Sequence, residues 1–265
     1  MKSNTQKSSP KNSQTSIADV AFDELAKNVI EFNSYLSHKN LAQFVTKLVD
    51  CSVKEQRVFI DDLFTSEKSI NYMYEVFFPE TARLLGNYWS QDLLSFCKVT
   101  IGISNLQILL KQYDHLYLEH GNAHFYSPSI LLITPEKETH TFGSMLACRV
   151  FQKLGCSPFL IHGPEPKKLE NIIKINDFSL IGISLADFNL IEEVTKLVAV
   201  IRNVAPVHCP IILGGEIRNW PEKSIEIPGL DAINSNPKDV LEMCELTPHS
   251  GSSIEKNIIL NGFFK

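Results

Sequence analysis

Residues 138–143, Glu-Thr-His-Thr-Phe-Gly, have the types and spacing of a metal-binding loop. They follow an apolar run typical of a buried strand and precede a helical pattern, so His140 is expected in a loop at the carboxyl end of a strand. Ligands bind at that edge of an open α/β sheet. An imidazole there can coordinate a metal, while Glu138 holds its other ring nitrogen and fixes the tautomer. Gly143 leaves the start of the helix bare, so that a bulky ligand can approach the backbone.

Two further segments carry chemistry at the ends of predicted strands. Ser184 ends one apolar run, so its hydroxyl is expected over the sheet edge, and Gly214 and Gly215 directly follow another, which leaves bare backbone for a ligand. Each signal is weak alone, because serines and glycine pairs are common at strand ends and turns, and His140 taken alone fits an ordinary loop histidine better than a metal ligand. Their order along successive strands is the more specific signal.

Composition bounds the class of protein. The chain has 265 residues, 44% of them hydrophobic and 21% charged, with a net charge of -5, which suits one large or two modest globular domains and disfavours binding of a polyanion by charge alone. The apolar runs are too short to cross a bilayer, and the polar N-terminus lacks the apolar core of a secretory signal. The six cysteines are scattered without a C-x-x-C pair, which indicates small core residues in a reducing cytoplasm.

The first half of the chain is predicted to be helical. Residues 1–15 are polar and predicted to be disordered, and residues 16–122 form a helical bundle without a strand signal. Helices are expected from Ser16 onward, at 41–48 and 53–63, as a pair within 66–89 that breaks near Pro79, and at 92–119. A composition break at 121–128 is the predicted interdomain linker.

The second half alternates strands and helices. Strands are predicted at 129–133, 158–161, 180–184, 211–213 and 231–233, and helices at 143–154, 166–175, 190–204, 218–225 and 237–245. This rhythm implies right-handed crossovers and a parallel sheet covered on both faces. The predicted fold class is therefore α + α/β: a helical bundle cap, then a flavodoxin-like or Rossmann-like, doubly wound, five-stranded sheet at 128–246. Residues 247–265 form a C-terminal tail.

The three strand-end segments resemble the cobalamin-binding Rossmann-like domain, whose usual motif is Asp-x-His-x-x-Gly, over about residues 129–246. The resemblance implies that His140 binds cobalt and that Glu138 supports its ring. It also implies a slot for the displaced dimethylbenzimidazole tail, lined by Gly143, Ser184, Gly214 and Gly215. The adjoining residues assigned to the same cofactor site are Thr139, Thr141, Phe142 and Leu185.

The helical half resembles the capping bundle of cobalamin photosensors. Residues 85–92, Leu-Gly-Asn-Tyr-Trp-Ser-Gln-Asp, followed by Phe96 and Val99, carry this resemblance. It implies that Trp89 covers the upper face of the corrin, with Phe96 and Val99 beside it. A large aromatic side chain would shield a reactive cobalt–ligand bond. A tryptophan of the bundle core is the alternative interpretation of Trp89.

Glutamate in place of aspartate at residue 138, with His-Thr-Phe-Gly after it, is similar to the aerobic-repressor (AerR/PpaA) proteins of photosynthetic bacteria and to the C-terminal domain of the flavin sensor AppA. The resemblance implies a cobalamin-dependent, or in some accounts haem-dependent, regulator that binds a PpsR/CrtJ-type transcription repressor and responds to light or oxygen. The sequence has no recognisable DNA-reading motif, so direct DNA binding is expected to be weak or absent.

Other classes stay open at this point. A corrinoid methyltransferase carrier subunit has the same layout, and an axial His140 would serve the iron of a haem sensor equally well. A mutase is disfavoured because no catalytic barrel is present. A flavodoxin-like domain without a ligand is the least specific alternative. Among the remaining histidines, only His124 lies near the predicted cleft between the domains.

Overall fold

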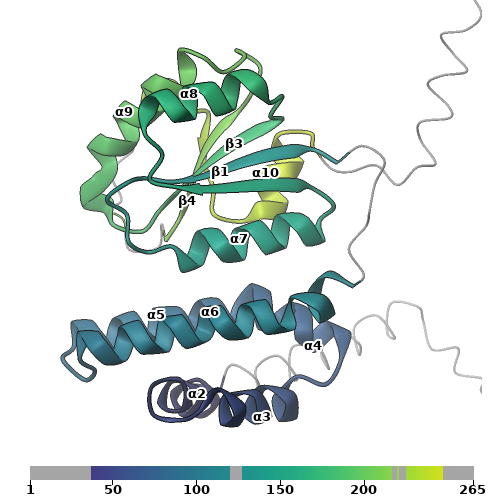
Figure 1. Cartoon of the computed structure of the whole chain (residues 1–265), viewed down its shortest axis with the longest axis vertical. Coiled ribbons are helices and arrows are strands. Elements are labelled where there is room, and N and C mark those ends of the chain that lie inside the picture. Colours follow the sequence, from purple (N-terminus) through teal and green to yellow (C-terminus); the bar gives the residue numbers. More distant parts are fainter. Residues whose placement is uncertain (1–36, 120–126, 217–219, 221–224, 247–265) are drawn as a thin grey trace, which may run out of the picture.

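The computed structural model describes residues 37–119, 127–216, 220 and 225–246. Within these ranges a helical bundle is stacked against a five-stranded sheet with helices on both faces (Figure 1). Both predicted tails, the helix from Ser16, the linker with His124, and most of the predicted helix at 218–225 lie outside the described residues. None of the helices in the described ranges is long and apolar enough to cross a membrane.

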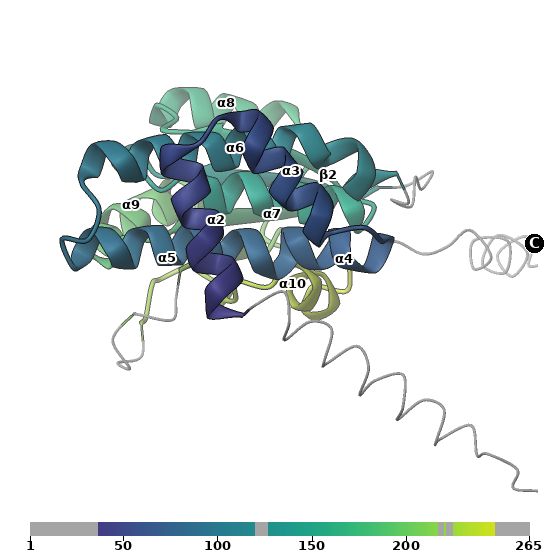
Figure 2. The ribbon, with the colours of Figure 1, turned by 90° about the horizontal axis from the view of Figure 1, so that it is seen from below.

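In the described residues the bundle consists of α2 (His38–Asp50), α3 (Val53–Leu63), α4 (Glu67–Tyr72), the π turn η1 (Met73–Phe77), α5 (Phe78–Ser90) and α6 (Phe96–Leu118). Serines begin several of them; the Ser52 side chain, for example, accepts from the Glu55 N–H while Glu55 binds back to the Ser52 N–H. Helix α2 packs across α5 and α6 (Figure 2). The contact between α2 and α5 is aromatic, because Phe44 stacks on Phe78 with the ring centroids 6.4 Å apart.

Two predicted features of the bundle are wrong in detail. The helix does not break at Pro79; the irregularity is the π turn before it, where the N–H of Phe78 donates to the carbonyl of Met73. Pro79 then lies in the first turn of α5, where a missing N–H is tolerated. Helix α6 begins at Phe96 rather than near residue 92, because Asp92 adopts a left-handed φ of 57° and Ser95 caps the helix.

The second half forms a parallel sheet in the order β2-β1-β3-β4-β5, which confirms the doubly wound, flavodoxin-like prediction. Its strands are β1 (Ser129–Thr134), β2 (Ser157–His162), β3 (Leu180–Leu185), β4 (Ile211–Gly215) and the short β5 (Ala232–Ile233). Helices α8 (Pro166–Ile175) and α9 (Ile191–Arg202) cover one face, and α7 (Phe142–Lys153) and α10 (Pro237–Met243) cover the other (Figure 1). The short 3-10 helix η2 (Phe188–Leu190) precedes α9.

Helix α7 joins the two halves, because it packs on the sheet with one side and on the bundle with the other. Cys148 and Phe151 belong to the core under the sheet, whereas Phe142 and Leu146 belong to the core of the bundle. An ion pair at 2.7 Å between Arg149 Nε and an oxygen of Asp114 on α6 adds a polar contact to this seam. The loop that carries His140 therefore leads straight into the element shared by bundle and sheet.

Gly215 gives a direct test of the sheet edge. Its φ is +114°, and a Cβ atom would lie 2.1 Å from the carbonyl oxygen of Leu185. We expect Gly215→Ala to lower the free energy of unfolding by about 3 kcal/mol or more, through backbone strain and overlap. Urea unfolding measures this change in the free energy of unfolding. The matched control is Gly86→Ala in α5, where a Cβ meets nothing within 4 Å, so stability should rise by up to about 1 kcal/mol. Equal effects of the two changes would contradict this geometry.

Candidate functional site

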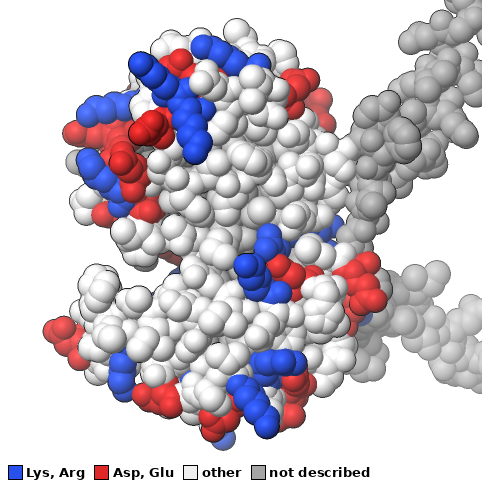
Figure 3. Space-filling model, viewed as in Figure 1, with Lys and Arg blue, Asp and Glu red and all other residues white. Residues whose placement is uncertain are grey.

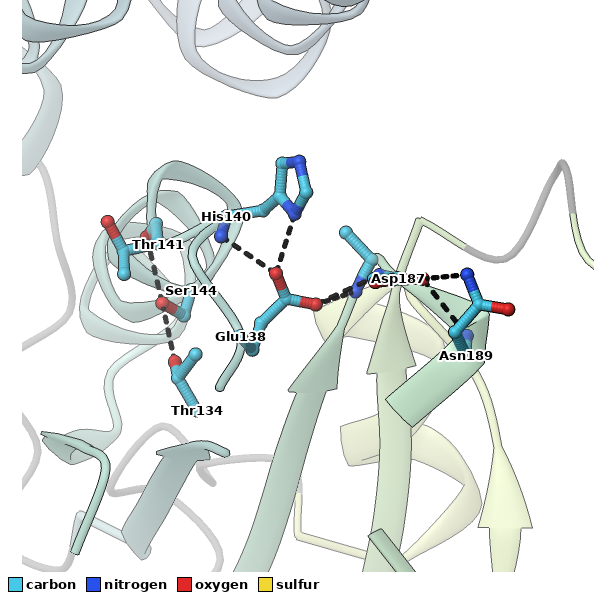
Figure 4. Close-up of polar contacts among 8 residues, drawn as sticks. Thr134, Glu138, His140, Thr141, Ser144, Asp187 and Asn189 are labelled. Carbon is cyan, nitrogen blue, oxygen red and sulfur yellow. Dashed lines mark hydrogen bonds and ion pairs between the residues drawn. The ribbon is translucent and has the colours of Figure 1, made fainter. Parts of the chain in front are cut away.

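Glu138 is a buried carboxylate at the carboxyl edge of the sheet, in the loop between β1 and α7. Its side chain is 1% exposed. Oε1 accepts hydrogen bonds from the backbone N–H of His140 at 2.8 Å and from its ring Nδ1 at 2.6 Å. Oε2 accepts from the backbone N–H groups of Ala186 and Asp187, at 2.7 and 2.9 Å (Figure 4). The side chain thus connects the loop after β1 to the loop after β3.

These contacts keep Glu138 ionised. Burial by itself raises the pKa of the carboxyl, but the hydrogen bonds from the His140 ring and from three backbone N–H groups outweigh it, and together they lower the pKa to about 2. A carboxylate that accepts this many N–H groups has its lone pairs largely satisfied without a counter-ion. The negative charge is therefore a permanent part of the site at neutral pH.

His140 is held by one ring nitrogen and is open at the other. A carboxylate can only accept, so Nδ1 carries the hydrogen, and in the neutral ring Nε2 has the free lone pair. The side chain is 60% exposed and points away from the sheet toward the bundle helices (Figure 4). The hydrogen bond to Glu138 raises the pKa of the ring, partly opposed by burial. This is the contact that the spacing of the two residues predicts, and it leaves Nε2 positioned as a ligand.

The other residues of the loop have different environments. Thr139 and Gly143 are exposed, and a Cβ at Gly143 would meet nothing within 4 Å, so the chain itself does not require this glycine. The carbonyl of Thr141 accepts from the Ser144 hydroxyl at 2.8 Å. The predicted cofactor residue Phe142 instead lies buried in the bundle core, because α7 turns that side toward the bundle. The open surface at the start of α7 therefore comes from Gly143 and not from Phe142.

The second and third predicted segments lie side by side, since Ser184 is in register with Gly214 and Leu185 with Gly215. Ser184 is half-buried, and strand alternation puts it on the face covered by α7 and α10, opposite to Leu185. Leu185 is buried in the core under α8 and α9, so the structure does not bring its side chain to the Ser184 face. On the Ser184 face, Thr134 donates to Ser144 at 3.1 Å, which adds two more hydroxyls to the same layer.

The predicted cap residues lie at the turn between α5 and α6. Trp89 and Phe96 are 48% and 68% exposed, with ring centroids 6.1 Å apart, so Trp89 is not a core tryptophan. Val99 is partly buried against the bundle core. The turn lies on the same side of the molecule as the carboxyl ends of the strands (Figure 1). On that side Figure 3 shows a notch between bundle and sheet with mostly uncharged walls.

Three features of this edge have no counterpart among the predicted residues. The backbone N–H groups of Ala186 and Asp187 bind Glu138, Glu216 pairs with Arg83 across the notch, and Leu93 is an exposed apolar residue between Trp89 and Phe96. Leu93 belongs to the same exposed turn as Trp89, which is a signal that the sequence offered. The Arg83 contact joins residues 133 positions apart, and no local pattern predicts it.

Comparisons with known proteins support the fold. No model of a known protein family matches the chain. A curated protein of Rhodobacter capsulatus, described as an uncharacterized 20.5 kDa protein in the bchF-crtJ intergenic region, is 24% identical over 179 residues, which make up 68% of this chain and 93% of that protein. The structure of the Methanosarcina barkeri monomethylamine corrinoid protein superposes with a TM-score of 0.63 at 11% identity, covering 79% of this chain and 99% of that one. The chain therefore shares its fold, helical bundle and parallel sheet together, with that corrinoid protein.

The Glu138–His140 contact makes a prediction about pH. The folded-state pKa of Glu138 is about 2 against an ordinary 4.5, so its contribution to stability is present above pH 4.5 and is lost as the pH falls to 2. Between pH 4.5 and pH 2 we expect the free energy of unfolding of the wild-type protein to fall by about 3 kcal/mol through Glu138 alone. Urea unfolding at stepped pH should show that Glu138→Gln lacks this pH-dependent contribution.

The same Glu138→Gln change should lower the pKa of His140, measured by NMR of the ring protons, because the charged acceptor is gone. Glu136→Gln, which removes an exposed carboxylate of the same loop, is the control and should leave the His140 titration unchanged. A His140 pKa that does not move in Glu138→Gln would show that the two side chains are not in contact in solution.

Proposed function

We propose that the chain binds cobalamin through His140 and works as a light- or redox-responsive regulator that controls transcription by binding a PpsR/CrtJ-type repressor. The observation that carries the cofactor assignment is the single imidazole whose Nδ1 is fixed by a buried carboxylate and whose Nε2 is free at the carboxyl edge of the sheet. The exposed aromatic pair on the opposing bundle supports it.

The protein donors at this site suit a metal that is already coordinated by a macrocycle. Among the described residues, no three His, Cys, Asp or Glu side chains are grouped so that they could hold a metal ion. A metal at His140 would therefore have one protein ligand, as in a corrin or porphyrin that supplies the ring nitrogens itself. A bare zinc or calcium ion needs several protein donors and does not suit this site.

The residues around His140 suit a large, flat, mostly apolar group. Trp89, Phe96 and Leu93 offer apolar surface on the bundle side, and Gly143 leaves the start of α7 open. The half-buried Ser184 offers a hydroxyl on the α7 and α10 face for a tail of the cofactor, whereas Thr134 and Ser144 on that face are buried and already donate their hydroxyl hydrogens. The chain itself requires Gly215, and a Cβ at Gly214 would lie 3.0 Å from the Asn234 carbonyl, so the two glycines are explained without a ligand.

An alkylcobalamin such as adenosylcobalamin would supply a light-sensitive cobalt–carbon bond at this site. The role of the protein is then to hold the imidazole, exclude water with the exposed aromatic side chains, and transmit a change at the notch through α7 to the seam with the bundle. A ligand change alters partner binding only if the two states differ in affinity. We therefore assign the partner surface to the seam that α7 shares with the bundle.

The regulatory part of the proposal draws on the relative from Rhodobacter capsulatus, whose description places its gene beside crtJ. CrtJ is also the name of the repressor type that the resemblance of residues 138–143 implies. The chain has no recognisable DNA-reading motif, which suits a regulator that acts through another protein.

A corrinoid methyl carrier is the second candidate, because the likeness to the monomethylamine corrinoid protein extends over 99% of that chain. Such a carrier would take a methyl group from a partner's substrate in the dark, whereas a regulator would not. A haem sensor would use the same imidazole. The cobalt and iron content of the pigment that elutes with the purified protein distinguishes a cobalamin protein from a haem protein.

The cofactor assignment predicts that His140→Ala abolishes His-ligated binding of hydroxocobalamin. Its reduced complex should have no protein nitrogen on cobalt in the EPR spectrum, whereas ¹⁵N labelling of the wild-type protein should change the splitting from the axial nitrogen. The matched control is His115→Ala, an exposed histidine of α6, which should bind as the wild type does. An unchanged visible spectrum in His140→Ala would remove His140 from the site.

The regulatory assignment predicts a difference between dark and light. Protein loaded with adenosylcobalamin should bind a PpsR/CrtJ-type repressor with at least a tenfold difference in Kd between dark and illuminated samples, measured by titration; this is about 1.4 kcal/mol of coupling. His140→Ala carried through the same preparation should show no light dependence. Equal affinity of the loaded wild-type protein in dark and light would refute the switch.

A further inference from the structure

Glu216 directly follows Gly215 at the end of β4, and only one of its carboxylate oxygens is satisfied. Oε2 forms an ion pair with Nε of Arg83 on α5. Oε1 is buried and has no hydrogen-bond partner in the described part of the chain, although the side chain as a whole is 23% exposed. A buried carboxylate oxygen without a donor costs free energy, so its retention beside the site calls for a ligand that supplies one.

The position of Glu216 is fixed from two sides. Its backbone N–H donates to the Leu185 carbonyl at 3.0 Å, which ties it to the end of β3. Arg83 holds its side chain from the bundle and also donates to Glu80 at 2.9 Å. Because parallel strands end at one edge, Glu216 lies on the same edge as the loop of His140, and its ion pair with Arg83 connects the sheet to the bundle.

The chemistry at the rim of a tetrapyrrole distinguishes the two candidate cofactors. The corrin of cobalamin carries amide side chains, whose N–H groups donate hydrogen bonds, whereas the porphyrin of haem carries propionates, which are anionic acceptors. Resting on the proposed function, we propose that Glu216 is a specificity-determining residue: its unpaired oxygen accepts from a peripheral amide of the corrin and disfavours a carboxylate in that place. The two oxygens of a carboxylate are equivalent, so whichever one does not pair with Arg83 is left to accept from the ligand.

The experiment compares ligands that differ in one group. The Kd of hydroxocobalamin is measured beside those of its monocarboxylic acids, in each of which one peripheral amide has been hydrolysed, and beside that of haemin. The wild-type protein should bind one of these acids with a Kd about tenfold higher than its Kd for hydroxocobalamin, and the ratio of these two Kd values measures the discrimination. In Glu216→Gln this ratio should fall to about one, and haemin should bind more tightly than to the wild type.

Two further variants test whether the charge of Glu216 itself is responsible. Arg83→Met removes the counter-charge, so discrimination against the same acid should exceed the wild-type value. Glu170→Gln removes a carboxylate of α8 that pairs with Lys174 at 3.5 Å within the same helix, and it should leave the ratio unchanged. The His-ligated spectrum of hydroxocobalamin in each variant reports that the site is intact.

The outcomes separate this inference from the proposed function. A wild-type chain that takes up no cobalamin refutes both. A wild-type chain that binds hydroxocobalamin through His140 but treats every monocarboxylic acid alike in wild type, Glu216→Gln and Arg83→Met refutes only the role of Glu216. A ratio that falls in Glu170→Gln as much as in Glu216→Gln would show an effect of net charge and would equally refute it.

Discussion

The site depends on one buried carboxylate. Glu138 is removed from water at the carboxyl edge of the sheet, and a charge in that position persists only if donors replace its hydration. Its four donors come from two loops: the backbone and ring of His140 on one side and the backbone of Ala186 and Asp187 on the other. The same contacts that stabilise the charge therefore tie together the loops after two paired strands and orient the imidazole.

Helix α7 carries that constraint into the rest of the molecule. Its first turn follows His140, its inner side packs under the sheet, and its outer side belongs to the core of the bundle. The Arg149–Asp114 pair and the Arg83–Glu216 pair connect bundle and sheet at two places along the same seam. A ligand that entered the notch would therefore act on a packed interface, and packed interfaces move between discrete arrangements and do not deform continuously.

Periodicity in the sequence was sufficient for the fold, because each strand and helix leaves a local pattern and the crossover rule leaves few orders for five strands. Periodicity did not predict the helix ends whose backbone geometry depends on packing. The π turn before Pro79 and the left-handed Asp92 both place a helix end away from its apolar pattern. Phe142 and Leu185 looked like site residues because they adjoin His140 and Ser184, yet α7 and strand alternation turn each of them into a core.

The sequence by itself determined the alternation of elements, the place of His140 after a strand, and its spacing from Glu138, because these are properties of neighbouring residues. Only the tertiary structure decided that Glu138 also binds the loop after β3, that Trp89 is exposed opposite the sheet edge, and that Glu216 meets Arg83. Those contacts join residues far apart in the chain. Their geometry is fixed by how the bundle packs on α7 and by which strands are adjacent, and no local pattern encodes either.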